Sequence, residues 1–216
     1  MTTQITVDIV IFTIRQKQLE VLLVKRRNQP FQGKWALPGG FVHEDEALDT
    51  AARRELKEET GVDKVYLEQL YSFGALQRDP RGRVITVAYF ALVDATTLSV
   101  HGASDASDAQ WFAMSALPPL AFDHHDILHY ALKRLRWKVG YTTVAFSLLP
   151  SSFTLTELQQ VYEIIFTKKL DKRNFRKKII ALGIITPLRE KQQEVSHRPA
   201  QLYTLSRQIG EMVEIF

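Results

Sequence analysis

Short apolar runs separated by polar turns fill the first part of the chain. Residues 5–14 are rich in β-branched side chains, and residues 19–24 repeat that pattern after a turn at 15–18, which predicts a β-hairpin. Three further runs predict strands by the same criterion: 65–73, 84–93 and 109–112. A stretch with helical spacing, roughly Glu44 to Thr60, lies among them. The pattern therefore predicts an α/β domain.

The periodicity changes after the Pro118-Pro119 break. Asp123 can cap a helix that runs to about Val139, and Gly140 is suited to follow its last residue. We place the domain boundary there, which gives a first domain of residues 1–140 and a second of residues 141–216.

The second domain reads as two short helices followed by a hairpin. Thr154 and Glu157 have the spacing of a capping box and predict a helix from Leu155 to about Phe166. Asp171 can cap a second helix from Lys172 to about Leu182. Two apolar runs, 184–185 and 202–205, then predict a two-stranded wing around a polar, basic loop.

Composition excludes several classes of protein. The chain has no cysteine, so it has no disulfide, thiolate metal site or cysteine nucleophile. Residues 1–12 lack the pattern of a secretory leader, and no run reaches the roughly 18 apolar residues of a membrane span. We expect a cytoplasmic protein.

The net charge of +4 is unevenly distributed. Residues 1–140 contain 17 Lys and Arg against 17 Asp and Glu, whereas residues 141–216 contain 11 against 7, so the whole excess lies in the second domain. A basic second domain favours a polyanionic partner, although a solvated basic surface has the same composition.

A spaced motif of glycine, glutamate and arginine occupies residues 40–62. Five residues separate Gly40 from Glu46, and seven more precede the run Arg54-Glu55-Leu56-Lys57-Glu58-Glu59-Thr60-Gly61-Val62. On a helix, Glu55 and Glu59 are neighbours, and Glu58 lies beside them. Carboxylates crowded in this way repel one another unless a hard cation binds, and oxygen ligands suit Mg²⁺ or Mn²⁺. The alternative is a solvated acidic helix face.

The motif resembles the Nudix signature at every defined position. The resemblance implies a Nudix fold, with a mixed β-sheet between helices, and a hydrolase acting on a nucleoside-diphosphate compound. It implies metal binding by the three glutamates just named, with the Gly39 carbonyl as a further ligand. It also implies a salt bridge between Glu46 and Arg54 that orients these glutamates, so we count both among the catalytic residues.

A turn rich in arginine follows the predicted strand at 65–73. It contains Arg78, Asp79, Arg81 and Arg83, and the arginine side chain suits phosphate and ribose because its fork makes paired hydrogen bonds. The segment 77–83 resembles one found in ADP-ribose pyrophosphatases of the Nudix superfamily and in their regulatory relatives. We therefore assign these four residues, with Gly39 and Gly40, to ligand binding; an exposed basic hairpin tip is the alternative.

The second predicted helix of the smaller domain is basic on its free face. Helix, short turn and helix is the plan of a helix-turn-helix DNA-binding module, and the hairpin would add a wing. Residues that would contact DNA share a basic or amide side chain on this helix or on the wing: Lys172, Arg173, Asn174, Arg176, Lys177, Lys178, Lys191 and Arg198. A basic helix packed in a dimer interface would have the same pattern.

Three segments together resemble the Nudix-related transcriptional regulators of NAD metabolism: 117–124, 153–159 and 170–177. The resemblance implies a homodimer in which a Nudix domain is joined to a winged helix-turn-helix, and in which ADP-ribose releases the DNA of NAD-metabolism genes. Many such regulators have a degraded Nudix box, whereas this box is complete, so we also expect hydrolysis of ADP-ribose to AMP and ribose 5-phosphate.

Two alternatives stay open at this point. One is an ADP-ribose pyrophosphatase whose second domain serves only dimerisation. The other is a sugar-responsive regulator, since arabinose-responsive regulators share this architecture but depart more strongly from the box. For the adjacent His124 and His125 we expect a structural role at the domain junction rather than a metal site or general base.

Overall fold

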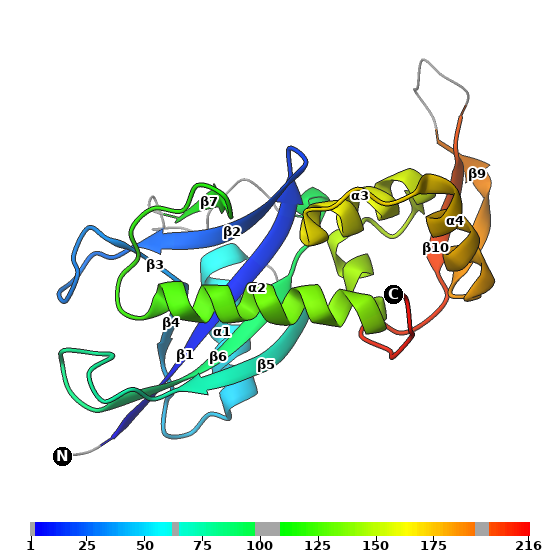
Figure 1. Ribbon diagram of the computed structural model, residues 1–216. Coiled ribbons are helices and arrows are strands. Elements are labelled where there is room, and N and C mark those ends of the chain that lie inside the picture. The colour runs from blue at the N-terminus through cyan, green and yellow to red at the C-terminus, as the bar shows by residue number, and fades with distance from the viewer. Residues whose placement is uncertain (1–2, 62–64, 98–108, 193–198) are drawn as a thin grey trace. The chain divides into compact units, whose positions relative to one another are not determined.

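The computed structural model describes residues 3–61, 65–97, 109–192 and 199–216 (Figure 1). These residues form two compact units, residues 1–134 and residues 135–216. None of the helices in these ranges has the length and apolar character that crossing a membrane requires.

A mixed sheet of seven strands forms the centre of the first unit. Its main path has the order β3-β2-β1-β6-β5, while β4 pairs with β1 and β7 pairs with β2. The strands are β1 (Gln4–Arg15), β2 (Gln18–Lys25), β3 (Trp35–Ala36), β4 (Gly39–Phe41), β5 (Tyr66–Phe73), β6 (Val84–Leu92) and β7 (Ala109–Ala113). β1 and β6 run parallel and the other pairs are antiparallel.

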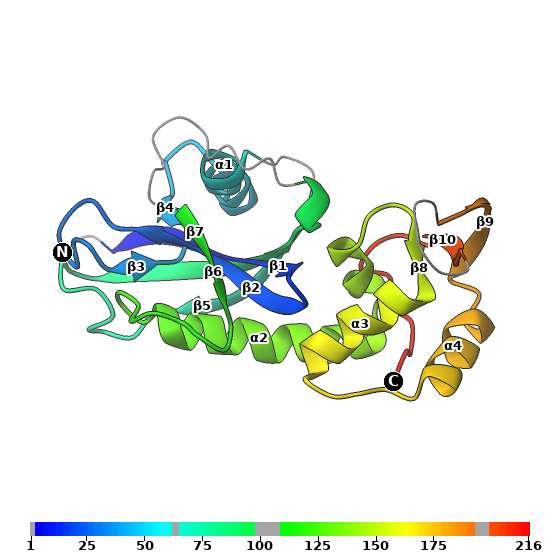
Figure 2. The same ribbon diagram turned by 90° about the horizontal axis from the view of Figure 1, so that it is seen from above.

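Helices cover both faces of this sheet, with α1 (Leu48–Thr60) on one side and the beginning of α2 (His124–Tyr141) on the other (Figure 2). A short 3₁₀ helix, η1 (Ala95–Thr97), follows β6. Side chains alternate along β1, so Val7, Ile9 and Ile11 pack with Ala51 and Leu56 of α1 in one buried cluster. This packing fixes α1, and with it the glutamates, against the sheet.

Two helix ends differ from the prediction. α1 begins at Leu48 rather than near residue 44, because Glu46 does not enter the helix: its carboxylate accepts the backbone N–H of His43 and two hydrogen bonds from Arg54. α2 continues through Gly140 to Tyr141. It ends where Thr142 adopts an extended backbone and accepts the N–H of Val144.

The second unit contains the predicted pair of helices and a small sheet. Its elements are η2 (Thr143–Leu148), β8 (Phe153–Thr154), α3 (Leu155–Phe166), α4 (Lys172–Ala181), β9 (Ile185–Lys191) and β10 (Gln201–Leu205), and the strand order is β8-β10-β9. The wing strand β9 is longer than the predicted 184–185. It includes Pro187, which β9 tolerates because it lies at the edge of the sheet.

Capping residues delimit both helices as predicted. Thr154 and Glu157 form a capping box: the Thr154 hydroxyl accepts the N–H of Glu157, and the Glu157 carboxylate accepts the N–H of Thr154. The Asp171 carboxylate accepts the N–H of Asn174 at the start of α4. Phe175 and Ile179 of α4 are buried, which leaves Lys177 and Lys178 on the outer side of the helix.

We expect Thr154→Ala to destabilise the second unit by about 1 kcal/mol, because the backbone N–H of Glu157 at the start of α3 loses its acceptor, the Thr154 hydroxyl. Hydrogen–deuterium exchange of the first turn of α3 measures this loss directly. Thr154→Ser retains the hydroxyl and should exchange like the wild type. Equal protection in the alanine variant would show that the box contributes nothing.

Candidate functional site

A cavity of about 180 Å³ opens in the first unit. β1 and β4, the loops after β2 and β5, and the beginning of α2 supply its wall. The lining residues are Thr6, Asp8, Arg26, Leu37, Gly39, Gly40, Phe41, Arg78, Asp79, Arg81, Phe122 and His124. Five of the six predicted ligand-binding residues therefore meet in one place, and the sixth, Arg83, is not among them. Arg83 instead donates to the carbonyls of Gly74 and Ala75 and so closes the β5–β6 loop.

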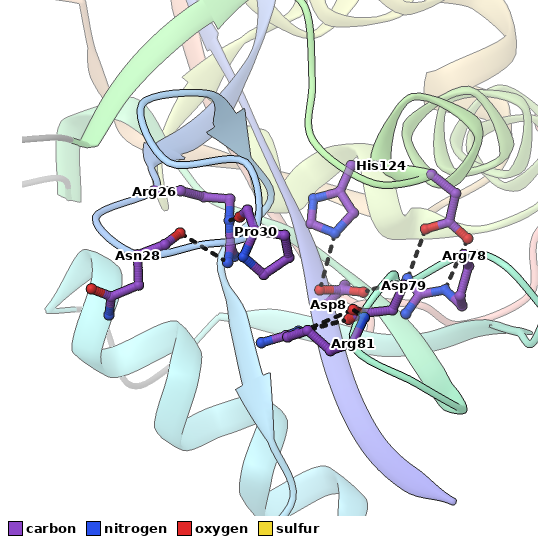
Figure 3. A network of polar contacts seen from close by, with 9 residues as sticks. Asp8, Arg26, Asn28, Pro30, Arg78, Asp79, Arg81 and His124 are labelled. Carbon is purple, nitrogen blue, oxygen red and sulfur yellow. Dashed lines mark hydrogen bonds and ion pairs between the residues drawn. The ribbon is translucent and has the colours of Figure 1, made fainter.

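Arg78 is the centre of a buried polar network in this wall (Figure 3). Its guanidinium donates to both carboxylate oxygens of Asp123, at 2.9 and 2.7 Å, and to Asp8 at 3.3 Å. Only 4% of its side chain is exposed. A buried cation needs such partners, so Arg78 is held by the protein's own carboxylates and joins β1 to the beginning of α2.

His124 completes this network. Its Nδ1 accepts the backbone N–H of Leu37 at 2.9 Å, and its Nε2 lies 3.6 Å from Asp8. Burial lowers the pKa of His124, and the acceptor role of Nδ1 places the proton of the neutral ring on Nε2. His124 is thus a fixed residue of the cavity wall in the first unit and does not lie at the domain junction, where its structural role was expected, whereas His125 points to solvent.

Arg81, which is partly exposed, forms a second polar pair of the cavity with the buried Asp79. Arg81 donates from Nη2 and Nε to Asp79, with a shortest distance of 2.6 Å, and its guanidinium lies 5.2 Å from the ring centre of Phe41 and 5.6 Å from that of Phe122. Arg26 lies 4.7 Å from the same Phe122 ring. Burial raises the pKa of Asp79, but hydrogen bonds from Arg81 outweigh it, so the net shift is downward. Cations stacked on aromatic faces suit an anionic ligand that carries a flat ring.

The predicted ion pair between Glu46 and Arg54 is present. Arg54 donates to both carboxylate oxygens of Glu46, at 3.1 and 2.7 Å, and these bonds with the N–H of His43 lower the pKa of Glu46 to about 2. The same guanidinium donates to Glu55 at 2.6 Å and lies 3.6 Å from Glu58. Arg54 therefore connects the loop before α1 to the carboxylates on α1.

Those carboxylates differ in their surroundings. Glu55 is buried, and burial raises its pKa; burial raises that of Glu59 too, and the charges of Glu55 and Glu58 raise it further. The side chain of Glu58 is 58% exposed. In the described part of the chain, no three acidic or imidazole groups converge closely enough to hold a metal. The carboxylate oxygens nevertheless fit a hard divalent cation. Glu55 and Glu59 are crowded and partly buried, so a bound positive charge would stabilise their ionised forms.

Gly40 places the backbone directly against this carboxylate group. A Cβ at Gly40 would lie 2.1 Å from Oε1 of Glu55, and one at Gly39, where φ is +156°, would lie 2.2 Å from the carbonyl oxygen of Val7. Only glycine permits this close approach. The two glycines therefore connect the cavity to the glutamate face of α1.

The sequence left several wall residues unassigned, among them Asp8, Arg26, Phe41 and Phe122. Asp8 had a usable signal, because it is a single charged residue within the apolar run 5–14. Arg26 and Phe122 come from loops and had none, since only the fold brings them beside Arg81.

The predicted DNA-contacting residues lie mainly on the exposed side of α4. Lys172, Arg173, Asn174, Lys177 and Lys178 are exposed, as is Lys191 on β9. Arg176 is half-buried and donates to the hydroxyl of Thr156 on α3, so it braces the two helices. Arg198 lies outside the described residues.

Comparison with known proteins matches both units. The NUDIX domain family matches residues 2–132, and the family described as the NrtR DNA-binding winged helix domain matches residues 145–205. The "ADPR responsive transcriptional repressor NtrR" of Acinetobacter baylyi is 44% identical over 94% of this chain and 82% of its own length.

Two solved structures extend the comparison. Shewanella oneidensis NrtR in complex with a 27mer DNA superposes with a TM-score of 0.86 at 40% identity, covering 94% of this chain and 93% of that one. The NUDIX domain of the same regulator in complex with ADP ribose covers 62% of this chain and 90% of its own, with 42% identity and a TM-score of 0.57.

An ADP-ribose pyrophosphatase of Methanocaldococcus jannaschii is 40% identical over 59% of this chain and 72% of its own length. The two family matches follow one another along the chain, and the Acinetobacter baylyi relative covers 94% of it. This chain therefore belongs to the NrtR family, in which a Nudix domain is followed by a DNA-binding winged helix domain.

Proposed function

We propose that this protein is an ADP-ribose-responsive transcriptional repressor. The observation that carries the proposal is that relatives named for this function and for DNA binding match both units, not the Nudix domain alone. The exposed basic residues of α4 support it, because lysine and arginine on a recognition helix supply phosphate and base contacts.

ADP-ribose is the ligand that we assign to the cavity. Arg81 and Arg26 lie beside the rings of Phe41 and Phe122, which suits a compound that combines a diphosphate with an aromatic base. The relative whose Nudix domain was solved with ADP ribose supports the same ligand.

We propose that ligand binding is coupled to DNA release through the first turn of α2. Phe122 and His124 line the cavity, and Asp123 holds the buried Arg78. A ligand that contacts Arg81 and Phe122 touches the residue that directly precedes Asp123 and the first turn of α2. The same helix continues from there into residues of the second unit. Release then reflects a difference in ligand affinity between DNA-competent and DNA-incompetent states.

Hydrolysis is the second proposed function, favoured by the intact glutamate motif and by the ADP-ribose pyrophosphatase relative. Glu55, Glu58 and Glu59 would hold Mg²⁺ or Mn²⁺, with the Gly39 carbonyl as a further ligand. When bound, the cation supplies neutralisation of the diphosphate and an activated water. Arg54 keeps Glu55 in place and Arg81 binds the substrate, so that water adds across one P–O–P bond to give AMP and ribose 5-phosphate.

The resemblance to regulators of NAD metabolism supports NAD-metabolism genes as targets and a homodimer as the assembly. Two copies would present two recognition helices to an operator with two-fold symmetry. A repressor of this kind acts on chromosomal DNA, which supports the cytoplasmic location expected from the sequence.

We expect Glu59→Gln to reduce AMP release from ADP-ribose by at least about 100-fold, because a neutral amide is a poor ligand for a hard cation. The same variant should still bind its upstream DNA in a gel shift and release it when ADP-ribose is added. Together the two assays separate ligand sensing from turnover. Unchanged turnover would remove Glu59 from the metal site, and DNA retained at saturating ADP-ribose would contradict the repressor mechanism.

We expect Arg173→Ala to weaken operator binding by about tenfold or more, the effect of losing one good base contact. Arg207→Ala is the matched control, because Arg207 is an exposed arginine of the same unit that pairs with Glu211 and lies off α4. Fluorescence anisotropy at several salt concentrations measures both variants, and wild-type affinity should fall steeply as salt rises. Equal losses in the two variants would indicate a general charge effect instead of a recognition helix.

We expect Asp123→Asn to raise the concentration of ADP-ribose needed to release DNA, because the amide weakens the paired hydrogen bonds to Arg78. Basal DNA affinity should change little. Asp126→Asn is the control, because Asp126 lies in the same turn but its side chain is 80% exposed. With Mg²⁺ as the only divalent cation in the assay, this variant should respond to ADP-ribose like the wild type. If Asp123→Asn released DNA at the same ADP-ribose concentration as the wild type, the first turn of α2 would have no part in DNA release.

A further inference from the structure

A pair of histidines on the exposed side of α2 has no part in the cavity or in the glutamate motif. His125 and His129 are four residues apart, so their side chains lie one above the other on the helix. Both are exposed, and their ring centres are 4.3 Å apart. His124, the next residue in the chain, is excluded from this pair because its ring is buried and its Nδ1 is already hydrogen-bonded.

The distance between the Nε2 atoms of the two rings matches the distance between two nitrogen ligands of one metal ion. The Nε2 atoms of His125 and His129 lie 3.2 Å apart. Two nitrogens bound at about 2.05 Å to the same metal lie about 2.9 Å apart at a right angle and about 3.3 Å apart at the tetrahedral angle. The observed distance falls between these values, so the two nitrogens already have the separation that one cation requires.

A carboxylate lies near the other nitrogen of the His125 ring. Asp126 lies 3.9 Å from Nδ1 of His125, a charge contact that is longer than a hydrogen bond. Metal-binding histidines commonly have a carboxylate at the second nitrogen, which favours the tautomer with a free Nε2 and makes that nitrogen more basic. Asp126 is placed to take up this position beside Nδ1 after a small movement of its exposed side chain, which would leave Nε2 of His125 free for a metal.

We infer that His125 and His129 form a binding site for a divalent transition metal of the Zn²⁺, Ni²⁺ or Cu²⁺ class. Imidazole nitrogen suits these ions, whereas Mg²⁺ prefers oxygen, so this site is chemically distinct from the glutamates of α1. Among the described residues no third protein ligand completes the set, so water fills the remaining positions. A metal bound across one turn cross-links the start of α2.

Isothermal titration of the full chain with ZnSO₄ tests the site, with the affinity tag removed and Mg²⁺ present throughout at saturating concentration. We expect one Zn²⁺ bound per chain. His125→Gln and His129→Gln should each weaken binding at least tenfold, and Asp126→Asn by several-fold. His43→Gln, which removes another exposed histidine, is the matched control and should leave this binding unchanged.

Two further measurements separate this site from the glutamates and from a simple contact between rings. The double variant Glu55→Gln/Glu59→Gln should retain the same Zn²⁺ binding, and the electron paramagnetic resonance spectrum of bound Cu²⁺ should show coupling to two imidazole nitrogens. A direct N–H···N hydrogen bond between the rings is the competing account. No Zn²⁺ uptake, uptake that survives both histidine substitutions, or a Cu²⁺ spectrum with one nitrogen would overturn the inference.

Discussion

The first unit depends on one buried cation, the guanidinium of Arg78. Three hydrogen bonds to Asp8 and Asp123 compensate its removal from water, and each partner comes from a different part of the chain. Removing one partner of such a buried group leaves an uncompensated charge and costs on the order of 3–5 kcal/mol. The loop after β5, the strand β1 and the start of α2 are therefore held together by electrostatics, and the cavity exists because these three segments meet.

This requirement explains how the arginines of one short loop take three roles. The guanidinium of Arg78 is hydrogen-bonded to the two aspartates, while Arg83 closes the loop by donating to backbone carbonyls. Arg81 is left beside Asp79 and two phenylalanine rings, at 39% side-chain exposure, where a ligand can reach it. The three look equivalent in the sequence because the chemistry of arginine is the same in each place. The difference between them is the partner that the fold supplies.

The sequence was most informative where function depends on local spacing. The glutamate motif, the capping box at Thr154 and the cap at Asp171 involve residues within a few positions of one another, and the helix geometry that joins them is fixed. The start of α1 was placed too early because the contact between Glu46 and Arg54 competes with helix formation. β8, only two residues long, and most of β9 were missed, since pairing with β10 creates them and no local pattern does. The cavity wall was only partly predictable for the same reason: Arg26 and Phe122 meet through tertiary packing.

Residues 123–129, at and just before the start of α2, are divided between two sides of the helix. Asp123 and His124 face the buried network, whereas His125 and His129 face solvent. Successive residues on a helix are rotated by about 100°, so a sequence of neighbouring acidic and imidazole side chains is necessarily divided between interior and surface. The interior side is constrained by the unfavourable burial of charge, which leaves it little freedom to change. The outer side has no such constraint. The imidazole pair there is either two exposed side chains without a function or a ligand set for a metal.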